Sequence, residues 1–128
     1  GDPWKSMGLI AGVIANRGKL LFMAGQVAND VHGNTIGMND IVAHTRQIYE
    51  NMKAILEESG GSFRDLVKQT TFYVIPPADR TEAERAALAS LRREYYSDHQ
   101  VASTGITIKG LARPEYQLEI EAIACIGE

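Results

Sequence analysis

The sequence has 128 residues, 45% of them hydrophobic, which is enough apolar material for one compact domain. Thirteen Lys and Arg against sixteen Asp and Glu give a formal net charge of -3. The lack of a basic stripe interleaved with aromatics argues against a nucleic-acid partner. One cysteine excludes an internal disulfide, and no apolar run approaches the roughly 18 residues of a membrane helix, so we expect a cytoplasmic protein without membrane contact.

The chain begins with GDPWKS, which lacks the basic and apolar regions of a secretory signal. We expect residues 1–6 to be an N-terminal extension or an expression remnant, and residues 7–128 to form a single domain. Two apolar runs, 8–15 and 19–27, flank the turn-favouring tripeptide NRG. They predict two antiparallel strands joined as a hairpin.

Residues 40–61 predict a helix, because apolar residues recur at helical spacing and two glycines close the segment. Residues 66–75 are rich in β-branched and aromatic residues and predict a strand. Thr81 and Glu84 have the spacing of a capping box that opens a second helix. The residues of that helix expected to face inward are Ala87, Leu88, Leu91 and Tyr95.

Two further strands are predicted, at 103–110 and in the closing run YQLEIEAIACIGE. Alternation in the last strand puts Glu119 and Glu121 on one face together with Ile123 and Cys125. Two carboxylates among apolar side chains suit neither open solvent nor a dry core. A cleft at a subunit boundary fits both kinds of residue.

The element order is therefore β-β-α-β-α-β-β, an α+β fold with a mixed sheet and two helices on one face. Several strands carry apolar side chains on both faces, so the uncovered face needs a cover from outside the chain. Identical subunits in a closed ring are the most economical cover. A cleft between such subunits is a common place for a small-molecule substrate or ligand.

Three stretches, LLFMAGQVANDVHGNTIG, HTRQIYENMKAILEESGGSFRDLVKQTTFYV and QLEIEAIA, together resemble the Rid family, also called the YjgF or L-PSP family. The resemblance spans almost the whole chain. It implies a chorismate-mutase-like fold, a homotrimer with the sheets packed inside, and three clefts between subunits. We expect no metal and no cofactor.

In the best-known branch of this family, an arginine in a PARS segment pairs with the substrate carboxylate, and a glutamate in the last strand positions a water. The water attacks the C=N carbon of a 2-imino acid, and ammonia leaves. The resemblance carries the water-holding role onto Glu119, but the arginine falls on Ser103. The family's serine before GQ is Ala24, an asparagine of the second helix falls near Ala89, and a cysteine falls on Gly105.

These departures imply weak or no activity on simple 2-imino acids, because a hydroxyl replaces a charge-assisted bidentate pair. Ser103, Thr104 and Gly105 would still form a small anion or amide site, next to Ala24 and Gly25 of the GQ segment. Arg113 is the nearest basic residue downstream and is a candidate to reach the same cleft.

Each candidate also has a structural interpretation. Glu119 would be an acid paired with a Lys or Arg across a subunit boundary, and Arg113 a solvated loop residue. Glu121 is read as structural, a partner of Lys68 or Arg113. Cys125 is expected to be buried.

Other residues are expected to be structural as well. Tyr95 is read as core packing, and the pair Arg92 and Arg93 as a solvated helix face. His32, His44 and His99 show no metal-ligand spacing.

Three functions remain open. The first is a hydrolase that deaminates an imine or enamine with Glu119. The second is a ligand-binding or regulatory trimer without catalysis. The third, an endoribonuclease, follows only from names attached to the family and draws no support from the charge of this sequence.

Overall fold

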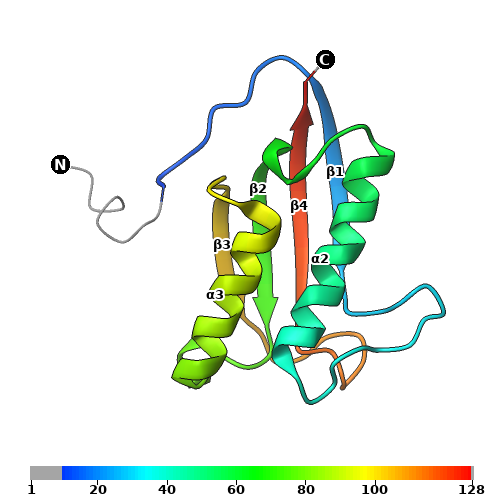
Figure 1. Ribbon diagram of the computed structural model, residues 1–128, viewed down its shortest axis with the longest axis vertical. Helices are drawn as coiled ribbons and strands as arrows, with labels where there is room; N and C mark the ends of the chain where they lie inside the picture. The colour runs from blue at the N-terminus through cyan, green and yellow to red at the C-terminus, as the bar shows by residue number, and fades with distance from the viewer. Residues whose placement is uncertain (1–9, 128) are drawn as a thin grey trace.

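The computed structural model describes residues 10–127. In these residues a four-stranded sheet in the order β1-β4-β2-β3 is packed against two α-helices, both on one face (Figure 1). The elements are β1 (Lys19–Gln26), α2 (Ile41–Glu58), η1 (Phe63–Asp65), β2 (Leu66–Tyr73), η2 (Pro77–Asp79), α3 (Glu82–Tyr96), β3 (Ala102–Thr107) and β4 (Leu118–Ile126). Strand β3 is parallel to β2, and β4 is antiparallel to both β1 and β2. The predicted α+β class, mixed sheet and one-sided helices are confirmed.

Both helices begin at side-chain caps. The carboxylate of Asp40 accepts from the backbone N–H groups of Val42 and Ala43 at the start of α2, and Thr81 and Glu84 form the predicted capping box of α3. Helix α2 buries Ile48, Met52 and Leu56 completely. Helix α3 buries much less, with Leu91 and Tyr96 as its buried residues.

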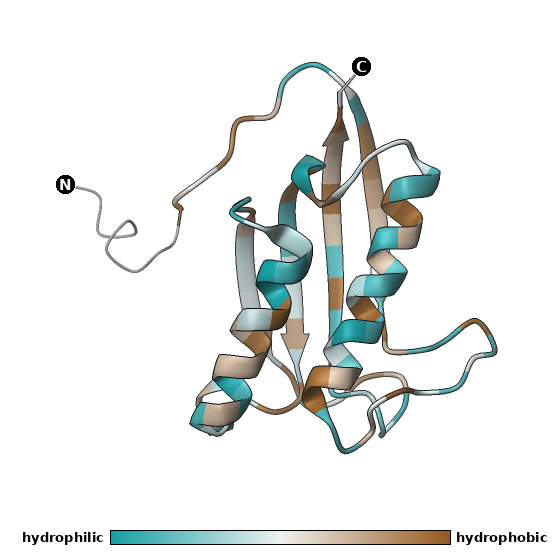
Figure 2. Ribbon diagram, viewed as in Figure 1, coloured by the Kyte–Doolittle hydropathy of each residue, from teal (hydrophilic) through white to brown (hydrophobic). Residues whose placement is uncertain are grey.

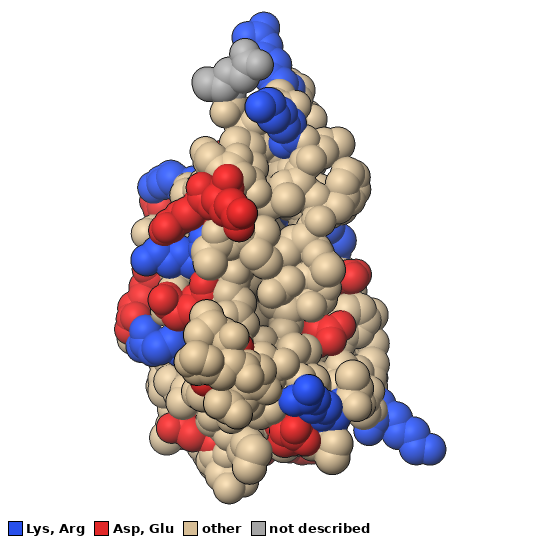
Figure 3. Space-filling model, turned by 90° about the vertical axis from the view of Figure 1, so that its right-hand side faces the viewer, with Lys and Arg blue, Asp and Glu red and all other residues tan. Residues whose placement is uncertain are grey.

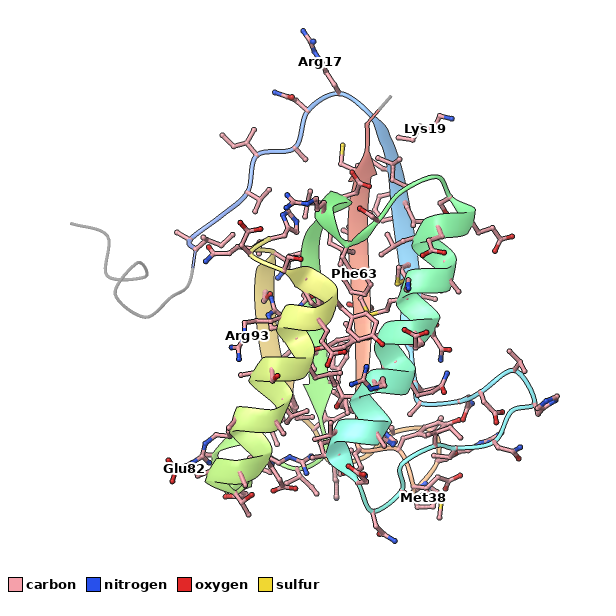
Figure 4. All side chains as sticks on the ribbon, in the orientation of Figure 1. Arg17, Lys19, Met38, Phe63, Glu82 and Arg93 are labelled. Carbon is pink, nitrogen blue, oxygen red and sulfur yellow. The ribbon has the colours of Figure 1, made fainter. Side chains whose placement is uncertain are left out.

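The expected inward position of Ala87 is wrong, because Ala87 is exposed. The buried residues of α3 are Leu91 and Tyr96, and the helix packs mainly against α2 and η1. Tyr95 does pack as expected, with its ring 5.2 Å from that of Tyr49 and 5.6 Å from that of Phe63. Phe63 lies between the two helices (Figure 4).

Strand β4 has the predicted alternation. Its helix-facing residues are buried, namely Leu118, Ile120, Ala122, Ala124 and Ile126. In Figure 2, β4 runs between the two helices with brown apolar bands and teal polar bands. The intervening residues of β4 are half-buried or exposed, and Cys125 is among them. The expectation that Cys125 is buried is therefore wrong for this chain, because its side chain lies on the face without helices.

The predicted first strand, 8–15, is wrong in the part that can be compared. Residues 10–15 form no strand, and Ile14 is 93% exposed; Gly8 and Leu9 lie outside the described residues. The chain does turn at the predicted place, with positive φ at Arg17 and Gly18. The segment before this turn runs away from β1, so its apolar residues pair with no strand among the described residues (Figure 1).

The sheet face without helices, called the open face below, combines apolar and polar side chains. Its residues are Leu20, Phe22, Lys68, Thr70, Phe72, Ala102, Thr104, Ile106, Glu119, Glu121, Ile123 and Cys125. Leu20 is 60% exposed and Phe22 69%. In the edge-on view of Figure 3, charged side chains gather on the helix side, at the left, and are sparse towards the middle. Exposed large apolar side chains in one patch are typical of an interaction surface.

The predicted boundary after residue 6 lies outside the described residues. Within residues 10–127, no helix is long and apolar enough to cross a membrane.

We predict that His44 makes stability depend on pH. His44 is fully buried; its Nδ1 lies 2.8 Å from the carbonyl of Ile36, and its Nε2 accepts from the backbone N–H of Gln117. Burial first, and then the charge of Arg80, lower the pKa of this imidazole from its ordinary value of 6.5. Below pH 6.5 the unfolded chain therefore binds more protons than the folded chain. The free energy of unfolding should fall with decreasing pH, by up to about 1.4 kcal/mol per pH unit.

Urea unfolding of wild type, His44→Gln and His32→Gln between pH 7.5 and 5 measures this contribution. The slope should flatten in His44→Gln and stay unchanged in His32→Gln, since His32 lies in an exposed loop. Equal slopes in all three proteins would contradict the assignment.

Candidate functional site

A cavity of about 780 Å³ lies on the helix side of the sheet. Its walls come from α2, β2, α3, β3 and the start of β4, together with Ile10 and Ala11 of the N-terminal segment. Ser103, Thr104 and Gly105 belong to these walls, and so does Ala89. The cavity thus brings together the positions of β3 and α3 at which the sequence departs from the Rid pattern.

Ser103 and Gly105 lie on the helix side of β3. Ser103 pairs in register with Gln69, which is buried beneath the helices. The Ser103 hydroxyl donates to the carbonyl of Val101 at 2.9 Å. A Cβ at position 105 would lie 3.0 Å from the ring of Tyr73, so glycine allows that ring to pack over the strand. This wall offers a hydroxyl and a flat aromatic surface, without a cation from β3 itself.

Thr104 has its register partner, Thr70, on the open face. Lys68 Nζ donates to Thr104 Oγ1 at 2.8 Å. The hydroxyl of Thr104 is therefore turned away from that of Ser103, because neighbouring strand residues point to opposite faces. Within the predicted triplet, Ser103 and Gly105 therefore face the helices, whereas Thr104 lies on the open face.

Glu119 lies on the open face beside β1. It is half-buried, and it forms no ion pair or hydrogen bond with another residue of the part that the structure describes. A Cβ built on Gly25 would lie 2.3 Å from Glu119 Oε2, so the carboxylate sits directly over this glycine. The register of β1 against β4 shifts between Met23 and Gln26, and Ala24 and Gly25 lie in this irregularity. The glycine thus makes room for an unpaired acid.

The remaining candidates lie elsewhere. Arg113 donates to the carbonyl of Gly33 at 3.4 Å, and its guanidinium carbon is 5.7 Å from the ring centroid of Tyr116. Glu121 is exposed and pairs with neither Lys68 nor Arg113 among residues 10–127. The predicted ion pair of Glu121 is wrong for a single chain, since Lys68 bonds to Thr104 instead.

Three arginines were missed as site residues. Arg80, Arg85 and Arg92 line the cavity, whereas Arg93 does not. Arg85, Leu88, Ala89 and Arg92 recur at helical spacing and form one stripe of α3 that faces the cavity. The same spacing is present in the sequence, but the apolar residues Ala87, Leu88, Leu91 and Tyr95 predicted a different inward stripe. The interpretation of Arg92 as solvated is wrong, because it is half-buried against Tyr96, with 4.1 Å from guanidinium carbon to ring centroid.

The predicted site residues therefore fall on two surfaces. Ser103 and Gly105 face the cavity under the helices, whereas Glu119 and Gly25 lie on the open face. The sheet separates these two groups, so one chain cannot bring them to the same small molecule. No group of three or more His, Cys, Asp or Glu side chains that could hold a metal ion occurs within residues 10–127.

Comparisons with known proteins agree with the fold. A model of the family described as Endoribonuclease L-PSP matches residues 10–126. The chain is 34% identical to a RutC family protein of Pyrococcus horikoshii over 107 residues, covering 84% of this chain and 79% of that protein. It is 26% identical to the 3-aminoacrylate deaminase RutC of Acinetobacter baylyi over 105 residues, covering 82% and 78%. The crystal structure of YyfB, a Rid family protein of unknown function from Yersinia pestis, has a TM-score of 0.80 and 33% identity, covering 97% of this chain and 91% of that one.

Proposed function

Since the chain belongs to the Endoribonuclease L-PSP family, also known as the Rid or YjgF family, we propose that it is a hydrolase that deaminates an imine or enamine metabolite. The observation that carries this proposal is the Glu119 carboxylate, half-buried, unpaired within the described chain, and placed over Gly25. Similarity to a 3-aminoacrylate deaminase supports an enamine-type substrate.

The proposed reaction needs a base and a bound water. The carboxylate of Glu119 accepts a proton from water while the water oxygen bonds to the C=N carbon and the nitrogen takes up a proton. Glu119 then passes its proton to the amino nitrogen of the carbinolamine; the C–N bond breaks, ammonia leaves, and the hydroxyl group loses its proton to solvent, so a carbonyl compound remains and the carboxylate is regenerated. An enamine first becomes the imine by gaining a proton at carbon and losing one from nitrogen. One water is consumed and one ammonia released, so the reaction needs no redox partner.

We further propose that the complete site lies between subunits of a homotrimer. Glu119 and Ser103 face opposite sides of their own sheet, so an open face that meets the cavity wall of a neighbour would combine them. The exposed apolar side chains of Leu20 and Phe22 are suitable for burial against a second copy.

Phe22→Asp tests this assembly. We expect wild type to sediment at three times the chain mass and Phe22→Asp to sediment as a monomer, because a charge would replace an apolar ring in the proposed contact. Val31→Asp is the matched control, since Val31 is 95% exposed but lies in the loop after β1. A monomeric wild type, or a trimeric Phe22→Asp, would contradict the proposal.

The activity is tested by following ammonia release from freshly generated 2-iminobutanoate and from a panel of bulkier imines and enamines. Wild type should be weak or inactive on 2-iminobutanoate and active on a bulkier compound. Ser103→Arg should gain activity on 2-iminobutanoate, because a guanidinium there would again pair with a carboxylate. No turnover of any compound by wild type would exclude the hydrolase.

A ligand-binding trimer without catalysis is the second candidate. The specific observation in its favour is that the Ser103 hydroxyl already donates to its own chain at Val101. Saturable binding with no ammonia release from the panel would establish this alternative.

A further inference from the structure

The cavity on the helix side is electrically positive. Three arginines line it, Arg80, Arg85 and Arg92, against one carboxylate, Asp98. Asp98 itself lies 3.4 Å from the guanidinium of Arg64. The side chain of Arg80 is only 9% exposed; its Nη1 atom lies 3.9 Å from Glu84 Oε2, whereas its Nη2 atom has no hydrogen-bond partner among the described residues. A partly enclosed cavity with excess positive charge favours an anionic ligand.

Arg92 is the best placed of the three to bind a ligand. Its guanidinium is 4.1 Å from the ring centroid of Tyr96, and Arg92 forms no ion pair with any acid within residues 10–127. Stacking occupies the face of the guanidinium and leaves the donors in its plane available. The buried hydroxyl of Tyr49 lies close to Arg92.

A chain of contacts connects Arg92 to the wall that carries Ser103. The hydroxyl of Tyr96, beneath Arg92, donates to Gln69 Oε1 at 2.7 Å. Gln69 is the register partner of Ser103. Arg92 and Ser103 therefore belong to the same end of the cavity, one on the helix and the other on the strand.

We propose that Arg92 binds the substrate carboxylate in this protein, from the helix wall of the cavity. This inference rests on the proposed deaminase function and deepens it by naming the substrate class. A guanidinium on α3 holds the acid group at a different place from one on β3. The substrate is therefore an imine or enamine whose carboxylate is separated from the C=N carbon by additional carbon atoms, rather than a 2-imino acid.

Binding of product-like oxo acids tests this inference separately from turnover. Calorimetric titrations use 4-oxopentanoate, its neutral amide 4-oxopentanamide, and 2-oxobutanoate, with Glu119→Gln as the background so that no chemistry occurs. The expected result is that 4-oxopentanoate binds more tightly than the other two probes. Adding Arg92→Gln should weaken its binding by about 10- to 100-fold, the range for a charge-assisted hydrogen-bonded pair.

Arg93→Gln is the matched control, because Arg93 is the next residue of α3, is exposed and lies outside the cavity lining. It should change the affinity by less than about twofold. Arg92→Gln also removes the stack on Tyr96, so Arg92→Lys provides a second variant. The lysine keeps the positive charge and a long aliphatic chain but lacks the planar guanidinium, so Arg92→Lys should bind 4-oxopentanoate with intermediate affinity.

Equal affinities of Arg92→Gln and Arg93→Gln for 4-oxopentanoate would overturn the assignment of Arg92. Equal binding of 4-oxopentanoate and 4-oxopentanamide, or no binding of 4-oxopentanoate, would overturn it as well. Tighter binding of 2-oxobutanoate than of 4-oxopentanoate would overturn the substrate class. These outcomes concern binding alone, so they remain distinct from failure of the deaminase proposal, which is judged by ammonia release.

Discussion

Glu119→Gln is expected to lower the rate of ammonia release by about 10²- to 10⁴-fold, the contribution typical of a positioned general base. Glutamine has the same size but cannot accept the proton of the attacking water. Glu119 has no ion-pair partner within residues 10–127, so the substitution removes no salt bridge of the described chain. We expect the free energy of unfolding to change by less than about 0.5 kcal/mol. The measurements are steady-state ammonia release on a compound that wild type turns over, and urea unfolding.

Glu121→Gln is the control for this prediction. Glu121 lies on the same strand and the same face, two residues further on, and is exposed. It should retain wild-type activity. Equal losses in both variants would indicate a general effect of negative charge on the open face, and full activity in Glu119→Gln would remove Glu119 from the mechanism.

Gly25→Ala is expected to reduce activity on the order of 10²-fold while the fold persists. The new methyl group would lie 2.3 Å from Glu119 Oε2, and the nearest atoms that it meets all belong to the Glu119 side chain. That side chain is flexible, so it can move away at little cost in stability. The carboxylate would then sit about 1 Å or more from its working position, and such a displacement costs about 10²-fold in rate.

Gly110→Ala separates this effect from a general response to losing a glycine. A Cβ at position 110 meets nothing within 4 Å, and its backbone needs no positive φ. This variant should keep wild-type kcat/KM. A crystal structure of Gly25→Ala should show the displaced carboxylate; unchanged activity with the carboxylate displaced would contradict the role of Glu119 as base.

Local sequence signals predicted most of the fold. The capping box at Thr81 and the alternation around Glu119 each depend on residues a few positions apart, and both are confirmed. The strand predicted at 8–15 does not form in residues 10–15. An apolar run indicates that residues will be buried, but it does not indicate which surface will bury them. Ile14 is exposed in the single chain, so its pattern cannot be satisfied by local pairing.

The candidate site was harder to predict because it depends on register and direction. The contact of Gly25 with Glu119 follows from the irregularity between β1 and β4, which no short pattern encodes. The opposite directions of Ser103 and Thr104 were predictable from strand alternation. Arg92 was missed because the ring that it contacts belongs to Tyr96. The sequence pattern placed the neighbouring Tyr95 in the apolar stripe and gave no role to Tyr96.

The sheet order also affects how the chain can fold during synthesis. Strand β4 comes after every other element in the sequence, yet it lies between β1 and β2 and pairs with both. Until β4 has left the ribosome, β1 and β2 have no strand that pairs with both of them. Pairings between distant segments form slowly, and exposed apolar surface in an unfinished chain promotes aggregation. We therefore expect the sheet to be completed only after residues 118–126 have been made.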